Sequence, residues 1–191
     1  MGCWKPNRLT PLAAILIAAY ACAESPTSPV PAGTPARAQV SPTDAVMSSA
    51  AATKSVARFE MDFMVDMIDH HAMAVMMSQL CLQKATHDEL RTLCSQIIAA
   101  QQREIATMQG WLKAWYGVTH EPEMKTGMMR MMERLSMLAG AEFEIEFMKQ
   151  MIRHHAKAIR ESEHCLRRAA HAELLQLCHD IRKNQNAEIA L

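Results

Sequence analysis

The sequence predicts an all-α protein: a four-helix bundle built from two duplicated helical hairpins, with a short Met-rich linking helix between them. Two observations carry this prediction. Residues 60–107 match residues 144–191 at a constant offset without a gap, and 23 of these 48 positions are identical. Within each copy, apolar residues recur every three or four positions along two stretches free of Gly and Pro, which is the pattern of amphipathic helices.

The composition narrows the possible functions. The chain has 191 residues, its 20 Lys and Arg balance its 20 Asp and Glu, and half of its residues are hydrophobic. This balance gives no basic surface for nucleic acid, and the apolar content is too high for a chain that is disordered throughout. Methionine is the unusual component, with 17 residues beside 9 His. Methionine serves either as flexible core packing or as a soft metal ligand.

The first 23 residues are predicted to be a secretory signal peptide. Lys5 and Arg8 precede an apolar run that ends in small residues and is too short to span a bilayer. We therefore expect the protein in the periplasm or another extracytoplasmic part of the cell envelope. Cys22 leaves two alternatives open: simple cleavage, or a lipoprotein in which acylated Cys22 becomes the mature N-terminus and is the only link to a membrane.

The segment after the signal peptide, residues 24–55, is rich in Pro, Ala, Ser and Thr. A segment of this composition cannot bury a core, so we predict a disordered, extended tether. The duplicated bundle is then expected to occupy residues 56–191.

Each repeat is predicted to be a helix, a tight turn and a second helix. One face of the first helix carries residues at steps of four, three, four and seven, namely Phe63, Met67, His70, Ala74 and Cys81. Thr86 and Glu89 have the spacing of a capping box, which predicts the start of the second helix. After a break at 117–122, residues 123–138 are predicted to form the linking helix. The second repeat stops at Leu191, so its last helix is expected to be about two turns shorter than its counterpart.

Four cysteines occupy matching positions in the two repeats: Cys81, Cys94, Cys165 and Cys178. Measured from the turn, the two cysteines of a repeat lie at similar heights on antiparallel helices. In an exported protein such an even, symmetric set favours disulfides, here Cys81–Cys94 and Cys165–Cys178. The alternative is a thiolate metal site, because His164 and His179 adjoin the cysteines of the second repeat.

A second group of residues combines His, Glu and Met. Counted from the turn, His70 lies level with Glu104 and one helical turn from Met67. The second repeat has the same arrangement, with His154, Glu188 and Met151. Pseudo-symmetry would bring these side chains toward a common axis, where buried ionisable groups need a partner or a metal ion. The alternative is a hydrogen bond between His and Glu within each hairpin, without a metal.

Three methionines of the first repeat have charged counterparts in the second. They are Met73, Met76 and Met77, which correspond to Lys157, Arg160 and Glu161. We therefore expect these methionines on a solvent-facing surface, near five more in the linking helix. Thioether and imidazole ligands outside a core suit Cu(I). The alternative is that the linking helix covers this Met face by plain apolar packing.

The repeated motifs resemble a known family. The pattern Phe-Met-x-x-Met-Ile-x-His-His-x-x-Ala, present twice, together with Glu-Ile-x-x-Met-x-x-Trp-Leu, resembles the domain of unknown function 305 family over about residues 56–191. The resemblance implies an exported, ferritin-like four-helix bundle, and the CopM-type members of the family bind copper and are linked to copper resistance. Carried over to this chain, it implies as ligands Met67, His70, His71, Met151, His154 and His155, with Met64 and Met148 behind them.

These observations favour an exported protein that binds and sequesters copper, or contributes to copper tolerance, rather than an enzyme. Cu(I) is favoured, and iron or zinc are less suited. Beyond the metal ion, a copper-handling envelope protein is the expected partner, and no nucleic acid is expected. Two alternatives stay open. One is a ferritin-like metal-dependent oxidoreductase that holds its ion with His70, His154, Glu104 and Glu188; the other is a metal-free helical adaptor whose methionines form a docking surface.

Overall fold

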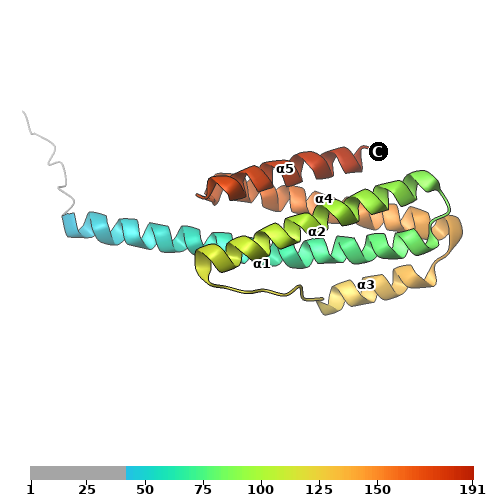
Figure 1. The fold of residues 1–191 in the computed structure, drawn as a ribbon, viewed down its shortest axis with the longest axis horizontal. Coiled ribbons are helices and arrows are strands. Elements are labelled where there is room, and N and C mark those ends of the chain that lie inside the picture. The colour runs from blue at the N-terminus through green and yellow to red at the C-terminus, as the bar shows by residue number, and fades with distance from the viewer. Residues whose placement is uncertain (1–41) are drawn as a thin grey trace, which may run out of the picture. The chain divides into compact units, whose positions relative to one another are not determined.

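Five helices make up the part of the chain that the structure, a computed structural model, describes, residues 42–191. They are α1 (Pro42–Lys84), α2 (Asp88–Tyr116), α3 (Thr126–Met137), α4 (Gly140–Arg168) and α5 (Ala172–Ile189) (Figure 1). No β-strand occurs within these residues, so the prediction of an all-α protein is confirmed. The predicted signal peptide, Cys22 and the first part of the predicted tether lie outside the described residues.

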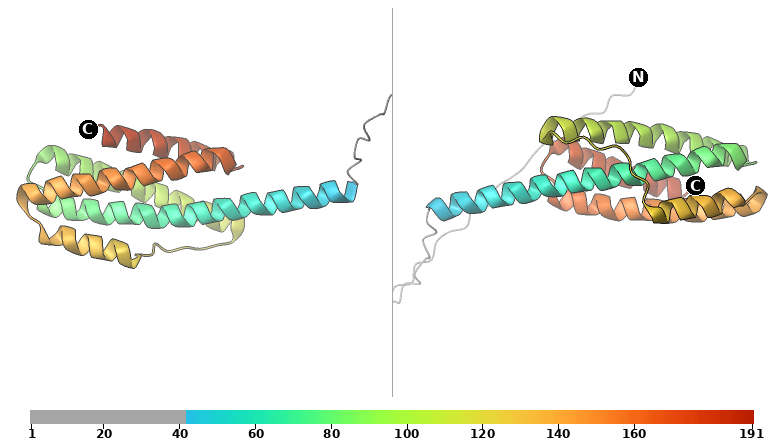
Figure 2. Two further views of the ribbon diagram at one scale, coloured as in Figure 1. Left: turned by 180° about the vertical axis from the view of Figure 1, so that it is seen from behind. Right: turned by 90° about the horizontal axis from the view of Figure 1, so that it is seen from below.

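Two helical hairpins pack side by side to form the bundle (Figures 1 and 2). α1 and α2 form the first hairpin, α4 and α5 form the second, and the hairpins contact each other mainly along α1 and α4. α3 lies outside this arrangement against α1 and α4, and an irregular segment, 117–125, connects it to α2. The predicted bundle of two duplicated hairpins with a linking helix is confirmed.

The helix α1 begins at Pro42, so the prediction of a disordered tether is wrong for residues 42–55. This segment is rich in Ala, the strongest helix former, and a Pro at the first position of a helix loses no backbone hydrogen bond. Its described side chains are exposed, and the segment extends beyond the other helices (Figure 2). Intrinsic propensity and continuity with the packed part of α1 account for this helix.

Both predicted disulfides are present in the structure. Cys81–Cys94 joins α1 to α2 and Cys165–Cys178 joins α4 to α5, with Cα–Cα distances of 6.4 and 6.3 Å. All four cysteines are fully buried next to the turn of their hairpin. Because every one of these sulfur atoms is engaged, the alternative thiolate metal site beside His164 and His179 does not form.

Each hairpin also supplies a carboxylate that caps a helix of the other hairpin. Glu144 on α4 accepts hydrogen bonds from the backbone N–H groups of Thr86 at 2.7 Å and of His87 at 3.1 Å, at the start of α2. Its second oxygen lies 2.6 Å from Nδ1 of His87. The equivalent acceptor at the start of α5 is Glu60 on α1, with donors from Ala170 and His171. A carboxylate here satisfies free N–H groups and interacts favourably with the helix dipole.

The predicted capping box of Thr86 and Glu89 is wrong. α2 begins after His87, which forms no side-chain cap, and the hydroxyl of Thr86 donates to Glu144 at 3.1 Å instead. The side chain of Glu89 is exposed, whereas Glu144 is buried. The cap comes from across the bundle, and a local sequence motif could not reveal it.

These caps perturb the acidity of both carboxyls. The backbone N–H groups of His87 and Thr86 lower the pKa of Glu144 from 4.5 to about 2, against the opposing effect of burial. For Glu60, burial raises the pKa, but hydrogen bonds from Tyr116, His171 and Ala170 together outweigh it and the net pKa is lowered. A carboxyl whose pKa is lower in the folded state stabilises the fold above its unfolded pKa, and this contribution disappears as the pH falls to the folded pKa.

We predict that Glu144→Gln lowers the midpoint of thermal unfolding at pH 7, because the neutral amide is a weaker acceptor for the start of α2. The variant should also lose less stability than the native protein as the pH falls from about 4.5 to about 2. Circular dichroism melts across this pH range measure both effects. Glu133→Gln, an exposed position on α3, is the matched control. Identical melting curves for Glu144→Gln and the native protein would contradict the capping role.

Candidate metal centre

The repeated His-His pairs meet at the point where α1 crosses α4. Nε2 of His70 lies 3.1 Å from the backbone oxygen of His154, and Nε2 of His154 lies 2.9 Å from the backbone oxygen of His70. Their rings stack with centroids 3.6 Å apart and an interplanar angle of 29°. The contact is reciprocal, so a local pseudo-two-fold axis passes between these two residues.

The second histidine of each pair faces the other helix of its own hairpin. Nε2 of His71 lies 2.6 Å from Oε2 of Glu104, and Nε2 of His155 lies 2.7 Å from Oε2 of Glu188. The expectation that His70 pairs with Glu104, and His154 with Glu188, is therefore wrong by one residue. Consecutive helical residues point about 100° apart, so only one histidine of each pair can face the partner hairpin.

All four histidines keep a buried Nδ1 atom without a hydrogen-bond partner. In His70 and His154 the Nε2 atom contacts a carbonyl, which can only accept, so Nε2 carries the proton and Nδ1 carries the lone pair. Donation from Nε2 of His71 to Glu104 leaves the Nδ1 atom of His71 with a lone pair as well. Nε2 of His155 lies 2.7 Å from the carboxylate of Glu188 but forms no hydrogen bond with it. A histidine that ligates a metal usually donates its other ring N–H to a carbonyl or a carboxylate in this way.

The rings on the axis are held neutral. Burial, with the nearby charges of His154, His71 and Lys157, lowers the pKa of His70 far below its ordinary value of 6.5. Burial, with His155 and other neighbouring charges, lowers the pKa of His154 to about 3. Neutral imidazoles can bind a metal ion near pH 7 without first releasing a proton.

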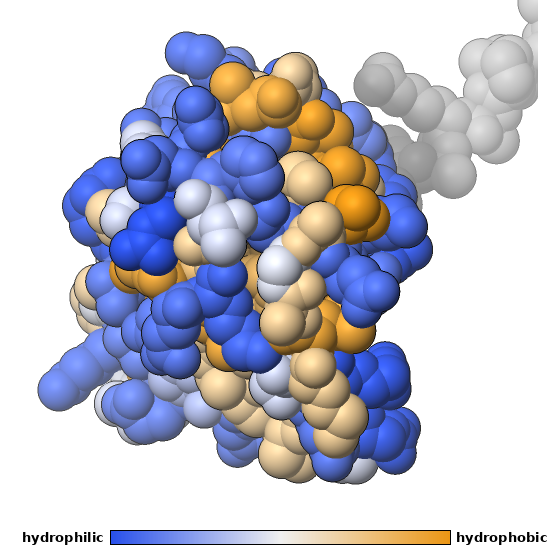
Figure 3. Space-filling view, turned by 90° about the vertical axis from the view of Figure 1, so that its right-hand side faces the viewer, coloured by the Kyte–Doolittle hydropathy of each residue, from blue (hydrophilic) through white to orange (hydrophobic). Residues whose placement is uncertain are grey.

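The methionines of the repeated motif are mostly buried. Met64, Met67 and Met151 are at most 4% exposed, whereas Met148 is 42% exposed. Figure 3 shows hydrophobic side chains gathered among hydrophilic ones on one end of the molecule. Met148 belongs to an apolar surface formed by residues of α2 and α4. There it lines, with Ile145, Leu93 and others, a groove of about 620 Å³.

The prediction that the unshared methionines form an exposed surface is wrong for two of the three. Met73 is 1% exposed and Met77 is 0% exposed, and only Met76, at 38%, reaches solvent. Their charged counterparts Lys157, Arg160 and Glu161 are exposed, as the comparison of the repeats predicts. The difference arises because α3 covers this face in the first repeat alone.

α3 covers the first repeat by apolar packing. Leu135 belongs to the same core cluster as Met73 and Met77, and three methionines of α3 pack against that cluster: Met128, Met131 and Met132. Buried Asp69 fixes the preceding segment, because its carboxylate contacts Nε2 of His120 at 2.7 Å and the backbone N–H of Glu123 at 2.8 Å. Lys84 donates to the backbone oxygen of Leu138 at 2.6 Å at the other end of α3.

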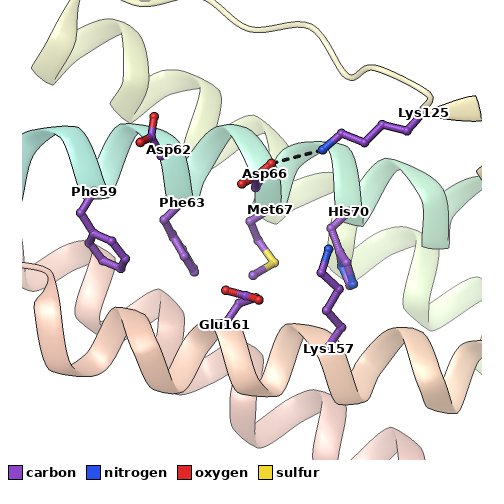
Figure 4. Close-up of a pocket in the computed structure, with 9 residues that line it drawn as sticks. All are labelled: Phe59, Asp62, Phe63, Asp66, Met67, His70, Lys125, Lys157 and Glu161. Carbon is purple, nitrogen blue, oxygen red and sulfur yellow. Dashed lines mark hydrogen bonds and ion pairs between the residues drawn. The ribbon is translucent and has the colours of Figure 1, made fainter. Parts of the chain in front are cut away.

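Two hollows bring predicted ligands together. A cleft of about 390 Å³ between α1 and α4 is lined by Met67 and His70, together with Lys157 and Glu161 (Figure 4). A smaller hollow of about 80 Å³ is lined by Met148, Met151, His155 and Glu188. Within residues 42–191, no three His, Cys, Asp or Glu side chains converge on one point.

Several polar residues that hold the fold together have no predicted role in the sequence analysis. Glu60 and Glu144 are identical in the two repeats, as are His87 and His171, so the comparison of the repeats held a signal for them. Asp69 had no such signal, because Arg153 takes its place in the second repeat.

Comparisons with known proteins identify a matching family and several solved structures that share this fold. Residues 60–191 match the domain of unknown function DUF305. CopM in its Cu(I)-bound form is 31% identical, with a TM-score of 0.62, over 69% of this chain and 90% of CopM. CopM in its Cu(II)-bound form is 32% identical with the same TM-score and coverage. A DUF305 protein from Streptomyces coelicolor is 26% identical over 69% of this chain and 86% of its own, with a TM-score of 0.62. No curated protein matches the chain.

We predict that Met77→Glu destabilises the fold by about 3 kcal/mol or more, because it buries an unpaired carboxylate beneath α3. The reverse change at the equivalent position, Glu161→Met, should alter the free energy of unfolding by no more than about 0.5 kcal/mol, since that position is exposed. Urea denaturation followed by circular dichroism measures both. Equal tolerance of the two substitutions would show that α3 does not seal the first repeat.

Proposed function

The chain belongs to the DUF305 family, and we propose that it is an exported copper-binding protein that sequesters copper or hands it on through Met and His ligands. One observation carries the proposal: each of the four imidazoles at the centre of the bundle has a buried Nδ1 atom without a partner, and in three of them, His70, His71 and His154, Nε2 is hydrogen-bonded to an acceptor. Buried polar atoms are rarely left unpaired, and an unpaired lone pair on a neutral, oriented ring is suited to a metal ion.

The donor set supports copper as the cargo. Met67 lies one helical turn from His70, and Met151 lies one turn from His154, so each axial imidazole has a thioether on its own helix face. Met64 and Met148 lie one turn further along the same helices. Thioether and imidazole together suit Cu(I), whereas iron and zinc sites draw mainly on carboxylate, imidazole or thiolate. The structural likeness to CopM, which has been crystallised with Cu(I), Cu(II) and silver, supports the same conclusion.

Export is part of the proposal. The signal-like first 23 residues support it, and so do the two disulfides, since disulfides persist in oxidising compartments such as the periplasm. Among residues 42–191, no helix is long and apolar enough to cross a membrane. Cys22 leaves both simple cleavage and a lipid-anchored form open, and a second copper-handling protein of the envelope would receive or supply the ion.

The geometry gives less support to the oxidoreductase alternative. That alternative needs two His and two Glu around one ion, but Glu104 and Glu188 pair with His71 and His155 on opposite sides of the axis. The adaptor alternative relied on exposed methionines, and Met73 and Met77 are instead sealed beneath α3. Storage or transfer of the ion therefore fits these residues better than either.

We predict that His70→Ala combined with His154→Ala weakens Cu(I) binding by about tenfold or more, the scale expected when a ligand or its support is lost. Competition with a chromogenic Cu(I) chelator measures the affinity, and circular dichroism confirms that the variant folds. His164→Ala combined with His179→Ala removes two exposed histidines outside the centre and is the matched control. If the folded native protein takes up no Cu(I), the proposal is wrong.

A further inference from the structure

The groove of about 620 Å³ between α2 and α4 is an uncovered apolar surface. It shares Leu93 and Met148 with the smaller hollow of about 80 Å³, and we call the two together the α2–α4 groove. Three of its large apolar side chains are about half exposed: Ile145 at 48%, Met148 at 42% and Ile152 at 46%. Figure 1 shows that α5 stops before the end of the bundle at which α1 meets α2. In the part of the chain that the structure describes, these three side chains are therefore left open to solvent.

The equivalent face of the other half is covered. By the offset of the repeats, the counterparts of these three side chains on α1 are Met61, Met64 and Ile68. Met64 and Ile68 are both 0% exposed, and they share a core cluster with Met108 and Leu112 from the C-terminal part of α2. The same cluster contains the α5 counterparts of the apolar groove residues of α2, namely Leu174, Leu177 and Ile181. In this half the last turns of α2 therefore fill the position that is open in the α2–α4 groove.

A histidine at the end of the groove also lacks a contact that its counterpart makes. His171, at the start of α5, stacks on Trp115 of α2 with ring centroids 3.9 Å apart and an interplanar angle of 6°. The next residue, Tyr116, donates a hydrogen bond to Glu60. The counterpart of His171 is His87, whose side chain is 72% exposed rather than 38%. Among the ring contacts of the described residues, none involves His87. Its imidazole face is free to receive an aromatic ring.

The charges of the α2–α4 groove are complementary to a basic segment. Its lining contains three carboxylates, of Glu89, Glu144 and Glu188, and no Lys or Arg. Glu89 is exposed and belongs to none of the ion pairs of the described residues. The segment that fills the equivalent position in the other half, residues 107–116, carries Lys113 and no acidic residue. A basic helix of this kind therefore matches the open groove in charge as well as in shape.

We infer that the α2–α4 groove is a docking site for a basic amphipathic helix of a partner protein. The helix presents large apolar side chains at steps of four and three, as Met108, Leu112 and Trp115 do in the other half, and its last aromatic ring stacks on His87. A second copy of this chain cannot supply the same segment of α2, because Met108 and Leu112 are fully buried in their own hairpin. This interaction surface is separate from the histidines on the axis and does not depend on copper binding.

The test uses a synthetic peptide of residues 104–116 with blocked ends, labelled with fluorescein and titrated with the whole chain in the presence of a metal chelator. Fluorescence anisotropy should show saturable binding. Ile145→Glu and Met148→Glu should each weaken binding by at least about tenfold, the effect of losing a central contact. Both positions are exposed, so the variants should melt as the native protein does. Met129→Glu makes the same change at an exposed methionine of α3 outside the groove and should leave binding unchanged.

Two variants of the peptide test the apolar and the basic parts of the inference. Leu112→Glu in the peptide should abolish binding, and Lys113→Glu should weaken it roughly threefold at low salt. Absence of saturable binding overturns the inference, as does equal affinity of the native chain, Ile145→Glu and Met148→Glu. Sedimentation of the native chain as a dimer, and of Ile145→Glu as a monomer, also overturns it, because a second copy would then cover this surface.

Discussion

The reciprocal contact between His70 and His154 is the constraint on which the rest of the structure depends. Each imidazole donates to the backbone of the opposite helix, so this contact favours a crossing of the two helices at this residue and in this register. In the same contact the Nε2–H group of each ring is the donor, which leaves the lone pair of the ring on Nδ1. It also orients the next residue, because a step of about 100° along a helix turns His71 and His155 toward the second helix of their own hairpin. The register of the two helices and the orientation of the imidazoles are thus linked through one pair of hydrogen bonds.

Further contacts across the axis hold the two hairpins in this register. Glu60 and Glu144 each reach from one hairpin to the first N–H groups of a helix in the other, where buried carboxylates are well satisfied. The disulfides act within a hairpin and the carboxylates act between hairpins. Together with the axial histidines, they form a symmetric frame in which unpaired polar atoms at the centre are held in fixed positions.

The two halves of this symmetric frame carry different surfaces. Asp69, which has no counterpart in the second repeat, fixes the segment that carries α3 over Met73 and Met77. The corresponding groove of the other half stays open and carries Lys157 and Glu161. Duplication followed by divergence at a few positions therefore yields one sealed groove rich in thioethers and one accessible groove with mixed donors.

The sequence by itself determined the helical class, the duplicated hairpins and the disulfide pairs. Helical periodicity can be read from neighbouring residues, and an internal repeat can be found by comparing the sequence with itself, so neither needs the tertiary structure. It also identified the motif histidines. Only the tertiary structure decided which histidine faces which partner, since a shift of one residue turns a side chain by about 100° and the repeat cannot fix that angle. The burial of Met73 and Met77 likewise could not be predicted from the sequence. Charged counterparts showed that the position is exposed in one half, but whether α3 returns over the other half depends on long-range packing.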